Sequence, residues 1–318
     1  MNVTSLNLSL LEDSRSATEQ TVITVWCCVS LILGLFGNCL LIHGIVNRAL
    51  KLDAISIWIV LNLAVADLEH SVVVVLPMSI SNLAGNRWVL GTRLCVASSV
   101  LVAQGFAARL VLVNLFAGLR LVRCMFPFCR SPVSTAHSRI FITATVLLAG
   151  SLFPLWNLVA HLNGYTVAVF WAIGSKCAGW PLSHQTVHRA LTLALFGAPC
   201  VPLTLSNLTL VRFAVKKSRA VKSSPNMKNI FVVLLVTLLM LLTLIPINLI
   251  NFFKVPVMKS VYFLRFATLF LNVSTFLNPF VFFLTHSSLR QFILKFLLRR
   301  NQSISSGISS SDHNHSSV

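Results

Sequence analysis

Residues 106–120, FAARLVLVNLFAGLR, carry two arginines, Arg109 and Arg120, in a stretch that is otherwise apolar or small apart from Asn114. The stretch lies within a longer apolar run over residues 92–124, and about 20 mostly apolar residues are enough for a helix to cross a bilayer. A charged side chain at the centre of such a helix costs about 2.5 to 3.5 kcal/mol and is expected to face a partner inside a bundle. The stretch therefore predicts a membrane-spanning helix packed among others.

The composition extends this prediction to the whole chain. Its 318 residues are 56% hydrophobic and 10% charged, whereas soluble domains average about a quarter charged residues. Seven apolar stretches are long enough to span a bilayer, and short loops separate them, so no separate soluble domain remains. The sequence predicts an all-α membrane protein, a seven-transmembrane helix bundle over 22–285. The expected spans are 22–46, 55–81, 92–124, 138–162, 187–214, 226–253 and 260–285.

The position of the cations predicts the orientation in the membrane. The net charge is +18, and sixteen of the 25 Lys and Arg fall in alternate connecting segments, from Arg48 and Lys51 to Arg299 and Arg300. Cytoplasmic loops carry an excess of Lys and Arg, so these segments are expected to be cytoplasmic and the N-terminus extracellular. The positive charge is thereby explained by topology and the lipid membrane, and we expect no nucleic acid partner. We expect a multi-pass protein of the plasma membrane.

The expected extracellular side carries further signals. Segment 1–21 contains glycosylation sequons at Asn2 and Asn7. Only Cys95 and Cys177, of eight cysteines, fall on that side, and a disulfide between them is compatible with its oxidising environment. The sequence holds no His-Glu-x-x-His motif and no Gly-rich phosphate loop. We therefore expect no enzyme, no cofactor and no metal site.

The C-terminal region divides into two parts. Residues 286–300 place Leu289, Phe292, Ile293, Phe296 and Leu297 on one helical face, which predicts an amphipathic helix on the cytoplasmic membrane surface. Residues 301–318 are polar and serine-rich, which predicts a disordered tail. Phosphorylated serines there would present negative charge to arrestin, and a purely solvating tail is the alternative.

Four motifs together carry a family resemblance. FGNCLL contains Asn38, LNLAVADL contains Asp67, NRWVLGTRLC leads into Cys95, and FLNPFVFF contains Asn278 and Pro279. In this order, over nearly the full length, they resemble the rhodopsin-like G-protein-coupled receptors. The stretches LNLAVADLEHSVVVVLP and NRWVLGTRLC also resemble the chemoattractant branch, which includes formyl-peptide, anaphylatoxin and one prostaglandin receptor. The resemblance implies a receptor that signals to a heterotrimeric G protein.

The chain departs from this family at its switch positions. Leu119 stands where the family's Asp-Arg-Tyr triplet has its acid and cannot pair with Arg120, and Phe282 lacks the hydroxyl of the family's tyrosine. Two interpretations follow, an atypical or weakly coupling receptor, or a coupling receptor with a looser resting state. Arg120 itself is expected to be a snorkelling arginine at the membrane interface, a contact for the G protein, or each of these at different times. The switch positions are Leu119, Arg120, Leu121, Leu244, Pro246, Asn278, Pro279 and Phe282.

The resemblance also suggests a partner for Arg109. At 1.5 Å per residue, its place fourteen residues after Cys95 puts it near mid-bilayer. In the family the matching residue and the aspartate matching Asp67 line an internal sodium pocket. We therefore expect an Arg109–Asp67 pair that takes the place of the ion, with Glu69 or an internal water channel as alternative partners. Further members of this polar pocket are expected to be Asn38, Ser274 and Asn278.

The ligand is predicted by position and charge. Val102 stands where amine receptors carry an aspartate, and Asn272 where opsins carry their retinal-binding lysine, so neither ligand is expected. The extracellular ends carry several cations and few acids, which favours an anionic lipid or peptide. The candidate contacts are Arg189, Lys254 and Arg265, each of which is alternatively a cation at headgroup level.

Two rival functions remain. Asp67, Glu69, His70 and Arg109 also fit a transporter's proton relay, although the chain lacks the paired half-chain symmetry that transporters show. A non-coupling scavenger receptor of the same fold would need none of the altered switch residues.

Overall fold

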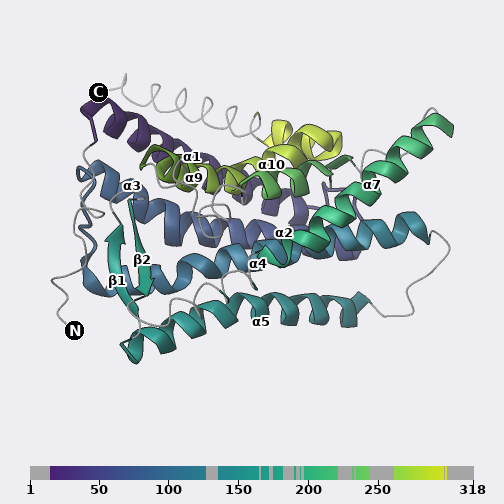
Figure 1. Ribbon diagram of the computed structural model, residues 1–318. Coiled ribbons are helices and arrows are strands. Elements are labelled where there is room, and N and C mark those ends of the chain that lie inside the picture. Colours follow the sequence, from purple (N-terminus) through teal and green to yellow (C-terminus); the bar gives the residue numbers. More distant parts are fainter. Residues whose placement is uncertain are drawn as a thin grey trace, which may run out of the picture.

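The structure is a computed structural model that describes residues 15–126, 135–164, 166–171, 175–181, 190, 194, 197–220, 231–232, 234–243, 261–296 and 298. Long helices run beside one another along one axis, and a β-hairpin lies at one end, which we call the hairpin end (Figure 1). In chain order the elements are α1 (Ala17–Val46), α2 (Ala54–His70), the π-helix η3 (Ser71–Val75), α3 (Leu76–Leu83), α4 (Gly91–Met125), α5 (Thr135–Leu162), β1 (Thr166–Trp171), β2 (Lys176–Pro181), α7 (Cys200–Ala220), α9 (Val261–Leu271) and α10 (Val273–Thr285).

Each of the seven predicted spans contains helix. Within the described residues, four helical runs are long and apolar enough to cross a membrane, namely Ala17–Val46, Ala54–Leu83, Gly91–Met125 and Tyr262–Thr285. Shorter apolar helices over Ala136–Leu152, Cys200–Phe213 and Leu234–Thr243 lie within the other three. The second span runs through α2, η3 and α3, and the seventh is divided between α9 and α10 at Asn272.

Local capping sets where two of the helices begin. The Ser16 hydroxyl accepts from the Glu19 backbone N–H while the Glu19 carboxylate accepts from the Ser16 N–H, a capping box that starts α1 at Ala17. The helix therefore begins four residues before the end of the head segment predicted over 1–21. At the opposite end of the bundle, the Asp53 carboxylate accepts from the Ser56 N–H and caps α2.

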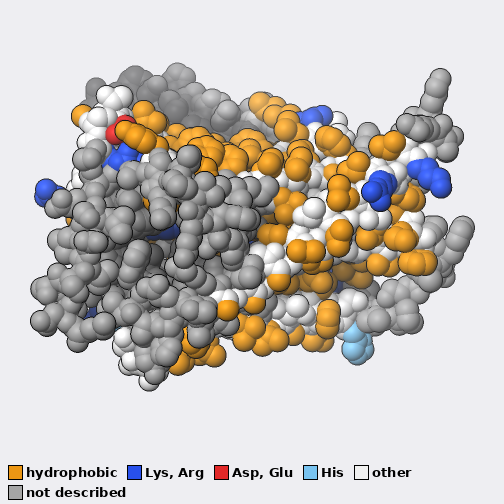
Figure 2. Space-filling view, in the orientation of Figure 1, with side chains coloured by type: hydrophobic (Ala, Val, Ile, Leu, Met, Phe, Trp, Pro, Cys, Tyr) orange, Lys and Arg blue, Asp and Glu red, His pale blue; other side chains and the backbone are white. Residues whose placement is uncertain are grey.

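The distribution of side chains fits a lipid environment. Exposed apolar residues such as Val22, Ile32 and Leu147 lie on the outside of the bundle, while Asp67 and Arg109 are fully buried. Figure 2 shows apolar side chains over most of the described part of one face, with the Lys and Arg side chains mainly toward its ends. In hydrocarbon, apolar surface needs no cover, whereas polar groups have to find partners within the protein.

The hairpin is an addition to the predicted all-α fold. β1 and β2 pair antiparallel with Phe170 opposite Cys177, and Cys177 forms a disulfide with Cys95 of α4. The bond joins residues 82 positions apart and fixes the hairpin to the first turns of α4.

The amphipathic segment forms a helix over residues 287–296 that packs on α1. Leu289 is fully buried beside Gly44, where even a methyl group in place of the glycine hydrogen would collide with the leucine side chain. The His43 ring lies 5.5 Å from that of Phe292 and 4.7 Å from that of Phe296. Leu297 and the tail 301–318 lie outside the described residues.

We predict that Cys95→Ser lowers the melting temperature and the cell-surface level of the protein. Loss of a native disulfide typically removes about 2 to 5 kcal/mol of stability, and this one closes an 82-residue separation. Thermal denaturation in detergent and surface labelling measure both effects. Cys39→Ser, at an exposed free cysteine of α1, is the control and should leave both unchanged. Equal behaviour of the two variants would contradict a stabilising role for the bond.

Candidate functional site

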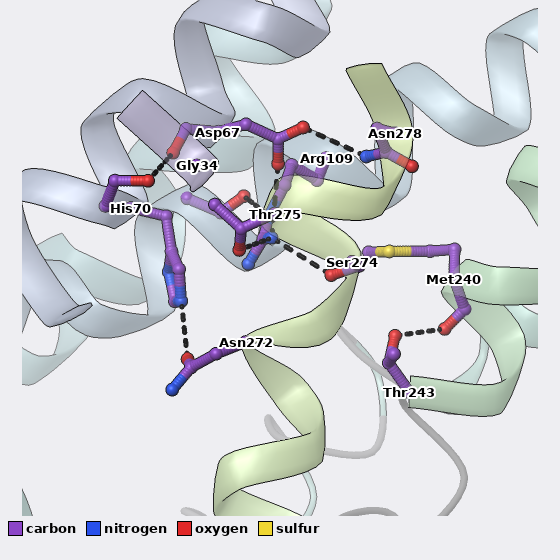
Figure 3. A network of polar contacts seen from close by, with 12 residues as sticks. Gly34, Asp67, His70, Arg109, Met240, Thr243, Asn272, Ser274, Thr275 and Asn278 are labelled. Atoms are coloured by element: carbon purple, nitrogen blue, oxygen red, sulfur yellow. Dashed lines mark hydrogen bonds and ion pairs between the residues drawn. The ribbon is translucent and has the colours of Figure 1, made fainter. Parts of the chain in front are cut away.

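A buried ion pair lies in the middle of the bundle. Arg109 Nη1 of α4 lies 3.2 Å from Asp67 Oδ1 of α2, and both side chains are fully inaccessible to solvent. The same Nη1 donates to Ser274 Oγ at 3.2 Å and to Thr275 Oγ1 at 3.1 Å, both on α10. Arg109 Nε donates to the carbonyl of Gly105 at 3.1 Å. One guanidinium thus joins three helices (Figure 3).

The other carboxylate oxygen is also occupied. Asn278 Nδ2 donates to Asp67 Oδ2 at 2.9 Å, so α10 contacts both members of the pair. Asn38 lies one step away, because its amide donates to the carbonyls of Gly34 and Thr275 rather than to the pair. The structure therefore brings together Asp67, Arg109, Ser274 and Asn278 and places Asn38 between α1 and α10. Among the described acids, Asp67 and not Glu69 lies within ion-pair distance of Arg109.

Two irregular turns lie next to the pair. The π-helix η3 begins directly after His70, and Ser71 donates to the carbonyl of Asp67 at 2.8 Å. The break at Asn272 separates α9 from α10, and Asn272 Oδ1 lies 3.3 Å from Nε2 of His70. Single π-turns within α-helices frequently occur at functional sites. These turns bring side chains of α2 and α10 to the same level of the bundle.

Aromatic packing encloses the guanidinium. Arg109 Cζ lies 4.3 Å from the ring centroid of Phe106, a cation–π contact, and the His70 ring packs edge-on against the same phenylalanine at 4.7 Å. Sequence reasoning missed Thr275 and Phe106 as partners of Arg109. Phe106 precedes Arg109 by three residues and so lies on the same helical face, a signal available in the sequence.

Arg120 is held at the end of the bundle opposite the hairpin. Its Nη2 donates to Ser56 Oγ at 3.1 Å and lies 3.6 Å from Asp53 Oδ2, while Arg123 Nη1 also forms an ion pair with that oxygen. Arg120 is only 9% exposed. The alternative of a snorkelling interfacial arginine is therefore wrong for this structure, because Arg120 packs inward onto the first turn of α2. Asp53 was not among the predicted partners.

The Asp53 carboxylate is ionised at neutral pH. Partial burial opposes its charge, but hydrogen bonds from Arg123 and Ser56 hold its pKa at about 2. Because the pKa is lowered, the stabilisation from this charge is complete above the ordinary pKa of about 3.9 and disappears only as the pH falls toward 2. The contact is therefore insensitive to pH between 5 and 8.

Apolar contacts surround the predicted switch positions that the structure describes. The fully buried Phe282 ring of α10 lies 6.4 Å from that of Phe116 on α4, and Arg120 Cζ lies 5.6 Å from the Phe116 centroid. Leu119 and Leu121 are partly buried against the same core, and Pro279 lies within α10. Leu244 and Pro246 lie outside the described residues.

The hairpin end joins its cations to polar partners. Arg265 Nη1 lies 3.2 Å from Glu19 Oε1, and Arg15 Nη1 donates to Asn82 Oδ1 and Ser175 Oγ, each at 3.0 Å. The charge of Arg265, a predicted ligand contact, is thus already opposed by an acid. The other candidates, Arg189 and Lys254, and the sequon residues Asn2 and Asn7 lie outside the described residues.

We predict that Asp67→Asn lowers the stability of the protein by about 3 to 5 kcal/mol, because it leaves Arg109 charged and unpaired in the bundle. The double variant Asp67→Asn, Arg109→Leu should recover part of this loss, since no buried charge remains. Melting temperatures of the two single variants and the double variant form a cycle that measures the coupling. Strictly additive effects would contradict an energetic coupling between the two side chains.

The sequence of this chain is similar to those of several known proteins. The C-C chemokine receptor type 8 of Mus musculus is 29% identical over 225 residues, which are 70% of this chain and 60% of that receptor. The probable G-protein coupled receptor 34 of Mus musculus is 22% identical over 308 residues, 89% of this chain and 78% of that protein. The neuropeptide Y receptor type 2 of Cavia porcellus is 28% identical over 228 residues, 69% of this chain and 57% of that receptor. The chain thus spans less than two thirds of the chemokine and neuropeptide Y receptors.

The fold has a solved counterpart in the crystal structure of squid rhodopsin. The TM-score is 0.72 at 14% sequence identity, covering 89% of this chain and 87% of that one. No family model matches the chain. The curated relatives are G-protein-coupled receptors and the fold matches the seven-helix fold of rhodopsin, which together support a rhodopsin-like G-protein-coupled receptor rather than an enzyme.

Proposed function

We propose that this receptor binds an extracellular anionic lipid or peptide and signals to a heterotrimeric G protein, with its N-terminus outside the plasma membrane. The observation that carries the proposal is the polar network in the middle of the bundle. Asp67, Arg109 and Asn278 connect α2, α4 and α10 between the disulfide-bound hairpin and the end that bears Arg120. A ligand that moves α4 or α10 at the hairpin end would therefore move helices that extend toward the opposite end of the bundle, where Arg120 lies.

The charge of the hairpin end supports an anionic ligand. Cations outnumber acids in the segments expected to be extracellular. Of the three candidate ligand contacts, the structure describes Arg265, which forms an ion pair with Glu19. Two relatives are named as a chemokine receptor and a neuropeptide Y receptor, which supports a peptide ligand and, for the first, the chemoattractant branch. Arg189 and Lys254 remain the proposed contacts for the anionic group.

Arg109 is proposed to occupy the place that sodium takes in the resembled family. Its guanidinium brings one positive charge to Asp67 and hydrogen bonds to Ser274 and Thr275. A tethered cation does not dissociate, so the charge of Asp67 is balanced in every salt solution.

The alternative function is a scavenger that binds and internalises ligand without G-protein coupling. Leu119 and Phe282 favour it, because both lack the polar groups of the family's switch. Such a receptor would depend on arrestin, with the serine-rich segment 301–318 as the proposed phosphorylated contact.

We predict that sodium leaves the melting temperature of the purified receptor unchanged when it replaces potassium at constant ionic strength. In Arg109→Ser the vacated position should accept the ion, and sodium at about tenfold its dissociation constant should then raise the melting temperature by about 2 to 4 °C. Arg123→Ser, outside the network, is the control for loss of a cation. Sodium-dependent stabilisation of the unaltered receptor would refute the tethered-cation proposal.

The function itself is tested by G-protein dissociation in cells that express the full chain at a verified surface level. Signals are recorded without ligand and with anionic lipids and chemotactic peptides, and arrestin recruitment is recorded in parallel. We expect dissociation above mock-transfected cells and its loss in Arg120→Gln. Silence from every G protein, with arrestin recruitment or ligand uptake intact, would instead establish the scavenger.

A further inference from the structure

We infer that Asp53 supplies the acid that the chain lacks at Leu119, and that it holds Arg120 against α2 in the resting receptor. The inference rests on the proposed coupling to a G protein, for which Arg120 has to become available. It places the restraint on a different helix from the one that carries the arginine. Release of Arg120 then requires the start of α2 to separate from the last turns of α4, at the end of the bundle opposite the hairpin.

The contacts of Arg120 carry this inference. Its Nη2 reaches the Ser56 hydroxyl at 3.1 Å and the Asp53 carboxylate at 3.6 Å, and Ser56 Oγ in turn donates to Asp53 Oδ2 at 2.6 Å. The Ser56 hydroxyl therefore links the guanidinium to the carboxylate by two hydrogen bonds. With 9% of its surface exposed, Arg120 cannot exchange these partners for water without moving.

Among the residues that the structure describes, Asp53 is the acid that lies within ion-pair distance of Arg120. The chain has seven Asp and Glu residues in all, and only Asp53 and Asp312 lie in segments predicted to be cytoplasmic. Asp312 belongs to the C-terminal tail. The cations on that side are many, and two of them, Arg120 and Arg123, share the single carboxylate of Asp53.

The capping role of Asp53 is separable from its role toward Arg120. Oδ1 accepts the Ser56 backbone N–H at 2.9 Å and caps α2, whereas Oδ2 faces the two arginines. Asparagine caps helices as well as aspartate does, because its side-chain oxygen accepts the same hydrogen bond. Asp53→Asn therefore keeps the cap and removes the charge, while Asp53→Ala removes both.

The test measures basal G-protein dissociation and melting temperature in the full chain at matched surface levels. Asp53→Asn should raise the basal signal, by about fivefold if release is limited by one partly exposed ion pair, and lower the melting temperature by about 2 to 4 °C. Adding Leu119→Asp to Asp53→Asn should reverse both changes, because the acid returns beside Arg120. Arg123→Gln is the matched control, since it removes the other arginine from Asp53 and should not raise the basal signal.

The outcomes separate this inference from the proposed function. Unchanged behaviour of Asp53→Asn beside a destabilised Asp53→Ala would reduce Asp53 to a helix cap and overturn the inference, as would failure of Leu119→Asp to restore the melting temperature. If Leu119→Asp restores the melting temperature of Asp53→Asn but no variant gives a G-protein signal, the result would support the view that Asp53 takes the place of an acid at position 119. The coupling proposal would then be the one that fails.

Discussion

A charged side chain inside a membrane protein needs an oppositely charged partner from the same protein, because the surrounding lipid offers none. This chain has few acids that can pair with its many cations. Three of its seven Asp and Glu residues form the ion pairs described above. Glu19 joins α1 to Arg265 of α9, Asp67 joins α2 to Arg109 of α4, and Asp53 at the start of α2 joins Arg120 and Arg123 of α4. The low dielectric constant strengthens each attraction and makes an unpaired member costly. Helix packing is thus constrained wherever an arginine enters the bundle.

The sequence predicts well those features that follow from distance along one helix or from composition. The apolar stretches give the spans, and the count of residues from Cys95 places Arg109 at mid-bilayer. Asp67 was expected as its partner from the family resemblance, because distance along the chain alone left Glu69 as an alternative. The partner of Arg120 was not predictable in this way. It depends on how far the first turn of α2 leans toward α4, and the sequence around Asp53 reveals only a helix cap.

Other missed features have similar causes. The hairpin consists of strands of six residues each, too short to be told from loop between apolar helices. The π-turn after His70 and the break at Asn272 change the rotation of a helix by a fraction of a turn. Such changes leave hydrophobic patterning intact, so the pattern does not reveal that Thr275 as well as Ser274 accepts a hydrogen bond from Arg109.

Two ties between the same pair of helices have different strengths. Asp53 and Asp67 are fourteen residues apart on the second span, and Arg120 and Arg109 are eleven apart on α4, so the ties are separated by about 16 to 21 Å. The central pair is fully buried, whereas the Arg120 and Asp53 side chains are 11% and 30% exposed. Solvent screens a partly exposed pair and leaves a buried one at nearly full strength. If activation separates α2 from α4, as the proposed release of Arg120 requires, we therefore expect the weaker tie to open first while the central ion pair still holds the two helices together.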